Sequence, residues 1–412
     1  MRMNTGKCCP DAANWRGLWF VAWCVCGLSL AFGFLSWDPV FTLWNLIFLP
    51  VHAIPAVLLV FGGRRLAQMS CCAGMCLVIH GVVSLLAPDP DFHSLPPRMS
   101  YEGVTTDELG FRTTPQVDYR AHNAFRIAVI GGSTAEEIHR HDTETWPYLL
   151  QEKLKSATGR RVEVINTGLS GMRMRHHAAT LRRIIKYKPD MVIVLAGIND
   201  WNEHIKQEFS PWHEPNRFHK ISRCDWRNRL LARNTIVGRS LIRLRYNRVF
   251  GLGRADVLAR LDRPGSLERS LRLRFLPSET YPEYAHYMRV VSDLCRRDGI
   301  LCLWLTQPTA YWNGVSSETR AKFWMTPPRQ EYTLTLDSLI HISRLYNGAT
   351  VRGACFFGDS FFDLASQFYS QEEMFADDCH FTQRGSERVA DLLMPVVLEM
   401  IDRCCRGKAC LQ

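Results

Sequence analysis

The stretch IAVIGGSTAEE, residues 127 to 137, decides the fold and supplies the first candidate functional residue. Four apolar residues typical of a buried strand lead into Gly131 and Gly132, and Ser133 then begins a segment suited to a helix. Such a turn could bind a phosphate, present a nucleophile, or merely connect two buried elements. Residues elsewhere in the chain decide among these three interpretations.

The phosphate interpretation needs a glycine pattern that this stretch lacks. A dinucleotide-binding turn carries G-x-G-x-x-G and a Walker loop carries G-x-x-x-x-G-K-[ST], whereas GGSTAEE matches neither. The chain also has no CxxC pair matched by a second His or Cys pair, so a zinc site is not indicated. We therefore expect no cofactor and no metal.

From Phe125 onward, strand-like apolar runs alternate with helix-like segments. We expect strands at 126–132, 160–168, 190–197 and 300–308, and helices at 133–159, 174–189, 281–299 and 382–405, with Thr382 as the cap of the last helix. This alternation is typical of a parallel sheet with helices on both faces. The predicted fold is therefore a three-layer α/β/α domain.

Small and polar residues follow several of the predicted strands. Ser133 follows the first strand, the loop NTGLSG (166–171) the second, and GIND (197–200) the third, while Asp377 and His380 precede the last helix. Ligands of such folds bind at the carboxyl ends of the strands. We therefore expect these residues to converge at one edge of the sheet.

These blocks carry a resemblance to a known family. Residues from about 125 to 404 resemble the SGNH/GDSL hydrolase superfamily, whose marker residues Ser, Gly, Asn and His lie in separate blocks in this order. Four segments match these blocks: Ser133 in VIGGST, Gly171 in NTGLSG, Asn199 in LAGIND, and Asp377 with His380 in DDCHFTQRG. One departure is Gly132, where many members carry Asp. The resemblance implies a flavodoxin-like SGNH hydrolase domain.

Elementary chemistry agrees with the roles that this resemblance implies. Ser133 would be the nucleophile, His380 would accept its proton, and Asp377 would fix the imidazole tautomer. The Ser133 N–H, the Gly171 N–H and the Asn199 amide would form an oxyanion hole. The opening stretch is thus interpreted as a turn that presents a nucleophile.

Several neighbouring residues compete for these roles. Asp378 adjoins Asp377, and only the three-residue spacing to His380 favours the latter; Gly168 competes with Gly171 within one loop. Asp200 could be a structural cap, and Cys379 would lack a separate partner as a nucleophile. Four histidines are interpreted as solvated helix residues: His139, His141, His176 and His177.

The nearest alternative enzyme class is the α/β-hydrolases. GGSTA differs from their G-x-S-x-G motif only at its last residue, and the chain order Ser, Asp, His also fits. In that class, however, the nucleophile usually follows several strands, and further secondary structure separates the acid from the histidine. Here Ser133 follows the first strand, and Asp377 and His380 share one loop, which favours the SGNH fold.

Residues 1–90 are predicted to be a membrane region. Residues 17–37 and 39–61 carry no charge, and 70–87 form a shorter apolar run. Each is close to the roughly 20 residues that span a ~30 Å hydrocarbon layer, so we expect three transmembrane helices. A cleaved signal peptide is disfavoured, because a second run follows at once and no clear cleavage site is present.

Basic residues predict the orientation of this region. Arg2, Lys7 and Arg16 precede the first run, and Arg64 and Arg65 lie between the second and third. The positive-inside rule then places the N-terminus in the cytoplasm and the large C-terminal part on the periplasmic or extracytoplasmic side. Residues 91–124 are predicted as a linker, and 125–405 as the hydrolase domain. Outside the cytoplasm Cys295 could pair with Cys302, or cysteines could pair within the cluster Cys404, Cys405 and Cys410.

The hydrolase domain contains a basic insertion at about 205–280. Residues 217–274 hold fifteen arginines and one lysine against four acidic residues, a net of +12 within a chain of net +10. Apolar residues interleave with the arginines, as in an amphipathic helix. An anionic lipid surface or an acidic glycan suits such a segment, and a solvated face suits it equally. Nucleic acid is not expected outside the cytoplasm.

The predicted function is that of a membrane-anchored serine esterase acting on acyl esters, such as acetyl groups, of envelope glycans or lipids. Transfer of the acyl group to a sugar hydroxyl would make the same residues an O-acyltransferase. The third possibility is a catalytically idle binding or assembly module. The presence of all five site residues disfavours it, because a binder does not need them together.

Overall fold

The computed structural model describes residues 91–209 with short gaps (93, 96–97, 99, 102, 114–116 and 120–122), residues 271–323 and residues 332–409. The three predicted membrane spans and most of the basic insertion lie outside these residues. Within the described part of the chain, no helix combines the length and the apolar character that crossing a membrane requires.

The centre of the domain is a parallel sheet of five strands. They are β3 (Phe125–Gly131), β4 (Val162–Asn166), β5 (Met191–Leu195), β7 (Leu301–Leu305) and β9 (Ser360–Phe362), in the spatial order β4-β3-β5-β7-β9. All four pairings are parallel. Numbered along the chain, this order is 2-1-3-4-5, the flavodoxin-like arrangement, whose ligand crevice opens where the order reverses, between β3 and β5.

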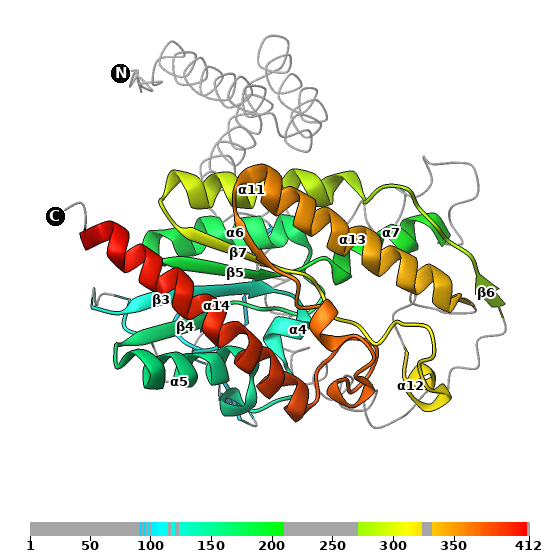
Figure 1. Ribbon diagram of the computed structural model, residues 1–412, viewed down its shortest axis with the longest axis horizontal. Coiled ribbons are helices and arrows are strands. Elements are labelled where there is room, and N and C mark those ends of the chain that lie inside the picture. The colour runs from blue at the N-terminus through cyan, green and yellow to red at the C-terminus, as the bar shows by residue number, and fades with distance from the viewer. Residues whose placement is uncertain are drawn as a thin grey trace, which may run out of the picture. The chain divides into compact units, whose positions relative to one another are not determined.

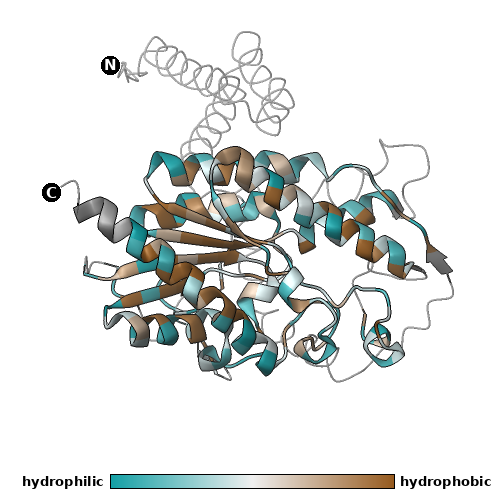
Figure 2. Cartoon of the chain, viewed as in Figure 1, coloured by the Kyte–Doolittle hydropathy of each residue, from teal (hydrophilic) through white to brown (hydrophobic). Residues whose placement is uncertain are grey.

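Helices cover both faces of this sheet (Figure 1). On one face lie α6 (Met174–Ile184), α11 (Pro282–Arg297) and α13 (Leu336–Phe357), and on the other lie α5 (Trp146–Thr158) and α14 (Gln383–Ala409). Side chains of β3 alternate between the two cores: Ala128 and Ile130 pack into the first, Ile127 and Val129 into the second. Figure 2 shows the central strands as predominantly hydrophobic. The predicted three-layer α/β/α fold is confirmed.

The single helix predicted over 133–159 is wrong. The chain instead forms the one-turn helix α4 (Ser133–Glu136), a 3₁₀ turn (Asp142–Glu144) and then α5. Glu137 ends α4 in the left-handed conformation, with φ of 49°. Pro147 lies in the first turn of α5, where a missing N–H costs nothing. The helical periodicity of the sequence therefore belongs to α5 alone.

The ends of the remaining predicted elements lie within five residues of their expected positions. Thr382 caps α14, because its Oγ1 accepts the Gly385 N–H at 3.2 Å. The prediction missed β9 and α13. Thr335 caps α13 by accepting the Ser338 N–H. The other elements are α7 (Ile198–Phe209), α12 (Ser317–Ala321), β1 (Ser100–Tyr101), β2 (Val104–Thr105), β6 (Leu271–Leu273), β8 (Tyr332–Leu334), and short 3₁₀ turns at Ile185–Tyr187, Ser366–Phe368 and Glu372–Met374.

Part of the segment predicted as a linker packs into the hydrolase domain. Strands β1 and β2 pair antiparallel there, and Leu95, Val104 and Phe111 are buried. Arg112 exchanges two backbone hydrogen bonds with Asn166, at 3.0 and 3.1 Å, and so extends the pairing at the end of β4. These residues lie against the same edge of the sheet as Ser133.

The pairing of Cys295 with Cys302 that the sequence allows is not formed in the structure. Both residues are buried free thiols.

Candidate active site

The structure brings Ser133, His380 and Asp377 into one hydrogen-bonded chain. His380 Nε2 lies 2.8 Å from Ser133 Oγ, and His380 Nδ1 lies 2.6 Å from Asp377 Oδ2. Ser133 comes from the start of α4, and the other two residues come from the loop before α14. All three side chains are buried. The arrangement suits transfer of the serine proton to the imidazole.

Backbone N–H groups orient the acid of this chain. Asp377 Oδ1 accepts the N–H of Cys379 at 2.9 Å and of His380 at 2.7 Å, which leaves Oδ2 for the imidazole. Asp378 does not compete, because its carboxylate accepts the Tyr311 hydroxyl at 2.7 Å. The three-residue spacing thus identifies the acid that contacts His380.

The pKa of Asp377 is lowered and that of His380 is raised, which suits an ionised acid beside an imidazole that accepts a proton. Burial alone would raise the pKa of Asp377, but the His380 ring and the two N–H donors more than offset it and lower that pKa. Burial alone would lower the pKa of His380, but the Asp377 carboxylate raises it above the ordinary value. Asp377 is therefore ionised and in a position to stabilise an imidazolium at His380.

Cys379 lies on the far side of the imidazole from Ser133. Its Sγ is 3.7 Å from His380 Nδ1, and burial raises the pKa of the thiol well above its ordinary value. The ligand-type atoms of Asp377, Cys379 and His380 lie within 4.8 Å of one another, the spacing of a metal site. Metal ligation by cysteine needs a thiolate, however, and the Asp377–imidazole bond already occupies Nδ1. The donor set thus fits a serine–histidine–acid site better.

Asn199, at the start of α7, reaches the nucleophile turn from the neighbouring strand β5. Its Nδ2 donates one hydrogen to the Met172 carbonyl at 2.9 Å, which fixes the amide and leaves the second hydrogen free to bind an oxyanion. A Cβ atom at position 132 would lie 2.5 Å from this nitrogen. Gly132 therefore permits the close approach of the amide, and the Asp that many SGNH proteins carry here would require Asn199 to shift.

The two glycines of the second block have different roles. The Gly168 N–H donates to Asn166 Oδ1 at 2.9 Å, and a Cβ there would meet the Glu136 backbone nitrogen at 2.5 Å. Gly171 has a φ of 76°, a Cβ there would meet open space, and no hydrogen bond within the described part of the chain uses its N–H. Gly168 is therefore committed to packing, and of the two glycines only Gly171 has an N–H that no hydrogen bond in the described part of the chain uses.

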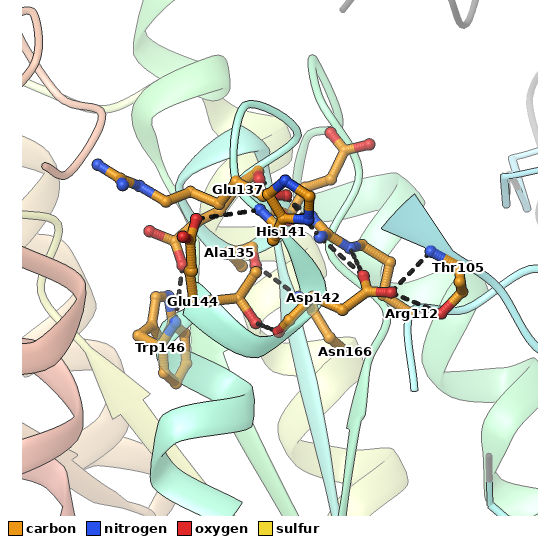
Figure 3. A network of polar contacts seen from close by, with 12 residues as sticks. Thr105, Arg112, Ala135, Glu137, His141, Asp142, Glu144, Trp146 and Asn166 are labelled. Carbon is orange, nitrogen blue, oxygen red and sulfur yellow. Dashed lines mark hydrogen bonds and ion pairs between the residues drawn. The ribbon is translucent and has the colours of Figure 1, made fainter. Parts of the chain in front are cut away.

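A buried carboxylate links the nucleophile helix to this glycine loop. Glu136, in the same helical turn as Ser133, accepts the Ser170 N–H at 2.6 Å and also the Ser170 hydroxyl. Burial raises the pKa of Glu136, against the opposing effects of Ser170 and Arg112. The next residue, Glu137, accepts the Trp146 N–H at 2.7 Å and the Ser386 hydroxyl of α14, and burial raises its pKa to about 7. Figure 3 shows Glu137 with Trp146 within this network.

The interpretation of the histidines as solvated helix residues is wrong for three of the four. His176 and His177 are buried on α6, because this helix packs between the sheet and α11. His139 is half-buried in the loop after α4, and its ring lies edge-on to the His380 ring at 5.9 Å. Burial, with the nearby His380, lowers the pKa of His139 to about 3, so its neutral Nε2–H donates to the Phe381 carbonyl at 3.1 Å. Only His141 is exposed.

Asp200 is a cap, as the sequence suggests, but of a different element. Both of its carboxylate oxygens lie 3.2 Å from the Met174 N–H at the start of α6. Burial raises the pKa of Asp200 to about 7. The carboxylate thus joins α7, which carries Asn199, to the helix that follows the glycine loop.

Asn199→Ala is expected to lower kcat about 10²- to 10³-fold with little change in KM, because the lost donor acts on the developing oxyanion rather than on the bound ester. Steady-state hydrolysis of p-nitrophenyl acetate measures both parameters. Asn202→Ala, three residues further along α7, is the matched control and is expected to retain its kcat. A raised KM with an unchanged kcat in Asn199→Ala would exclude the oxyanion role.

Residues 129–388 match the model of the GDSL-like lipase/acylhydrolase family. No curated protein matches the chain at a significant level.

Solved structures with a similar fold include three hydrolases. The acetyl xylan esterase AlAXEase is 13% identical, with 66% of this chain and 99% of that chain covered and a TM-score of 0.38. The esterase EstA from Pseudoalteromonas sp. is 10% identical, with 68% and 99% covered and a TM-score of 0.36. The lipase/acylhydrolase from Enterococcus faecalis is 16% identical, with 66% and 94% covered and a TM-score of 0.36. Since the family model spans more than half of the 412 residues, from the turn that bears Ser133 to the helix that follows His380, this chain belongs to the GDSL-like lipase/acylhydrolase family.

Proposed function

We propose that the protein is a serine esterase that cleaves acyl esters through an acyl-Ser133 intermediate. The observation that carries this proposal is the continuous chain from Asp377 through His380 to Ser133, with contacts of 2.6 and 2.8 Å. A catalytically idle module would have no use for this alignment together with an unoccupied glycine N–H and a half-used amide beside the serine.

In the first half of the reaction, Ser133 Oγ attacks the ester carbonyl carbon while His380 Nε2 takes the hydroxyl proton. The carbonyl oxygen becomes an oxyanion, which the Ser133 N–H, the Gly171 N–H and the Asn199 amide stabilise. The tetrahedral intermediate collapses, the C–O bond to the alcohol breaks, and His380 returns the proton to the leaving alcohol. The acyl group then remains on Ser133.

In the second half, water takes the place of the alcohol. His380 accepts a proton from the water as its oxygen attacks the acyl carbonyl, and the same three donors bind the second oxyanion. Collapse releases the carboxylic acid and returns the proton to Ser133 Oγ. If a sugar hydroxyl attacks instead of water, the identical steps make the protein an O-acyltransferase. Product analysis with an acyl donor and a glycan both present distinguishes the two fates.

The proposed substrates are acyl esters, such as acetyl esters, of envelope glycans or lipids. The apolar runs before residue 90 support membrane anchoring, and the basic residues around them support an extracytoplasmic catalytic domain. The arginine-rich segment at 217–274 supports contact with anionic lipid or an acidic glycan. A reporter fused near residue 93 tests the orientation, and cytoplasmic activity of that reporter would overturn the proposed location.

A fluorophosphonate probe tests the proposed chemistry directly. The wild-type protein is expected to be labelled, and Ser133→Ala is expected to lose the label, because the probe phosphonylates an activated serine hydroxyl. Ser343→Ala, which removes another buried serine hydroxyl on α13, is the matched control and is expected to be labelled like the wild type. Equal labelling of wild type and Ser133→Ala, or no labelling of either, would favour a binding module.

A further inference from the structure

Arg112 contacts the nucleophile turn from outside the part of the chain that matches the family. It precedes the first matched residue, Val129, and lies in the segment after β2. Its side chain is 3% exposed. Its backbone is paired with Asn166 at the end of β4, which fixes the Cα position beside the sheet edge. The mechanism above leaves this buried guanidinium without a role.

All five N–H donors of the guanidinium are used. Nη1 donates to the carbonyls of Glu136 and Glu137 at 2.5 and 3.0 Å, and Nη2 donates to the carbonyl of Arg140 at 2.9 Å. Nε and Nη2 lie 2.9 and 2.8 Å from Asp142 Oδ1. Figure 3 shows Arg112 between Asp142 and the backbone near Glu137.

Asp142 is in turn held by the segment that carries Arg112. Its Oδ2 accepts the Thr105 N–H at 2.7 Å and the Thr105 hydroxyl at 2.5 Å, as Figure 3 shows. The position of the guanidinium is therefore determined from two sides: by its own backbone at the end of β4, and by a carboxylate fixed on β2. Because the guanidinium is fixed in this way, it can in turn fix the backbone carbonyls to which it donates hydrogen bonds.

Two of the three carbonyls that Arg112 binds, those of Glu136 and Glu137, belong to the end of the turn that carries Ser133. Because α4 has only one turn, the carbonyls at its end have no intrahelical partners. Asn166 Nδ2 takes the Ala135 carbonyl at 2.8 Å, and Arg112 takes the next two. The Glu137 N–H donates to the Ser133 carbonyl at 2.8 Å, so one peptide joins the guanidinium to the serine backbone. A positive charge at a helix C-terminus also opposes the helix dipole favourably.

We propose that Arg112 is a positioning residue for catalysis: its guanidinium fixes the carbonyl end of α4 and thereby holds Ser133 Oγ at hydrogen-bonding distance from His380. This role rests on the proposed esterase activity. Lysine would keep the charge but only part of these hydrogen bonds, because an ammonium group presents three donors from one point, whereas these acceptors surround a planar fork. The functional catalytic unit therefore begins before the region that matches the family, at the segment that includes β1, β2 and Arg112.

A second buried arginine of the same domain provides a matched control. Arg126 lies at the opposite end of β3 from Ser133. Its Nε donates to Glu163 at 2.9 Å, its Nη1 to the Tyr187 carbonyl at 3.2 Å, and its Nη2 to the Asp118 carbonyl at 2.6 Å. Its side chain is also 3% exposed. Replacing either arginine removes a comparable buried network, but only Arg112 contacts the turn that bears the nucleophile.

The experiment compares Arg112→Met and Arg112→Lys with Arg126→Met and Arg126→Lys in the full-length protein, at a temperature well below each melting transition. Hydrolysis of p-nitrophenyl acetate gives kcat and KM, and the rate of fluorophosphonate labelling reports the reactivity of Ser133. We expect kcat of Arg112→Met to fall about 100-fold at an unchanged KM, since misplacement by ~1 Å can cost this much. Labelling should slow in parallel. Arg112→Lys should recover part of the loss, and both Arg126 variants should stay within about threefold of wild type.

Each outcome decides between two claims. A wild type that neither hydrolyses the ester nor reacts with the probe would overturn the proposed function itself. If the wild type is active, two results would overturn the positioning role alone. In one, the Arg112 and Arg126 variants have the same kcat; in the other, the Arg112 variants show a raised KM with an unchanged kcat. If Arg112→Met does not fold, Arg112→Lys decides: a folded lysine variant with the wild-type kcat and labelling rate overturns the role, and a selective loss of both supports it.

Discussion

In a His380→Ala variant, kcat for an unactivated acyl ester is expected to fall on the order of 10⁴- to 10⁶-fold, because Ser133 then has no base to accept its proton. The 2.8 Å contact between Ser133 Oγ and His380 Nε2 is the observation behind this expectation. An alkyl ester is the appropriate substrate, since its poor leaving group also needs the proton that His380 returns. Initial rates under saturating ester measure the effect.

His141→Ala is the control for this variant. His141 lies in the same loop region as His139 but is exposed, so its removal should leave kcat unchanged. The melting temperature of His380→Ala should remain near that of the wild type, since a loss of folding would imitate a loss of catalysis. A folded His380→Ala variant with more than a tenth of the wild-type kcat would refute the assignment of the base.

Asp377→Asn is expected to lower kcat about 10⁴-fold, because an amide at 2.6 Å from Nδ1 can favour the wrong imidazole tautomer and cannot stabilise the imidazolium. The same substitution should change the pH dependence. The base must be neutral to act, so wild-type activity rises as the pH passes upward through the pKa of His380. Asp377 raises that pKa, and its loss should therefore shift the acidic limb of the profile to lower pH.

Asp378→Asn is the control for Asp377→Asn. It removes a negative charge from the same loop but leaves the hydrogen bond between Asp377 and His380 intact. Its carboxylate also raises the pKa of His380, but its hydrogen bond goes to Tyr311. This variant should retain kcat within about tenfold of wild type and show a smaller shift of the acidic limb than Asp377→Asn. If the two variants had equal losses of kcat, or the limb of Asp377→Asn moved to higher pH, the assigned acid would be wrong.

The central fold could be predicted because its strands are apolar on both faces. The strands β3, β5 and β7 are buried between two helix layers, and continuous apolar runs are the sequence signal of that environment. The edge strand β9 has only three residues, of which Ser360 and Phe361 are exposed, so it gives no such signal. The order of the strands depends on which distant strands pair, and no local pattern of the sequence encodes it.

The candidate site could be predicted because its residues follow strands or precede a helix in recognisable blocks. Between chemically identical neighbours, the sequence offered only a preference, from spacing and from the family resemblance. Asp377 and Asp378 differ only in which carboxylate faces the imidazole, and Gly168 and Gly171 differ only in which N–H is already bonded. These choices depend on three-dimensional contacts with residues far away in the chain.

Arg112 and His139 were missed for a related reason. Each is a polar residue in an irregular segment, where hydrophobic periodicity carries no information about burial. Arg112 is buried because its partners are carbonyl groups, which every residue possesses and no sequence pattern reveals.

The hydrogen bond between His380 and Ser133 joins residues 247 positions apart in the chain. A ribosome must therefore add His380 and the helix after it before the serine can acquire its base, although the strand leading to Ser133 is made much earlier. During synthesis the growing polypeptide carries an unactivated serine hydroxyl, and its reactivity appears only when the last helical layer docks.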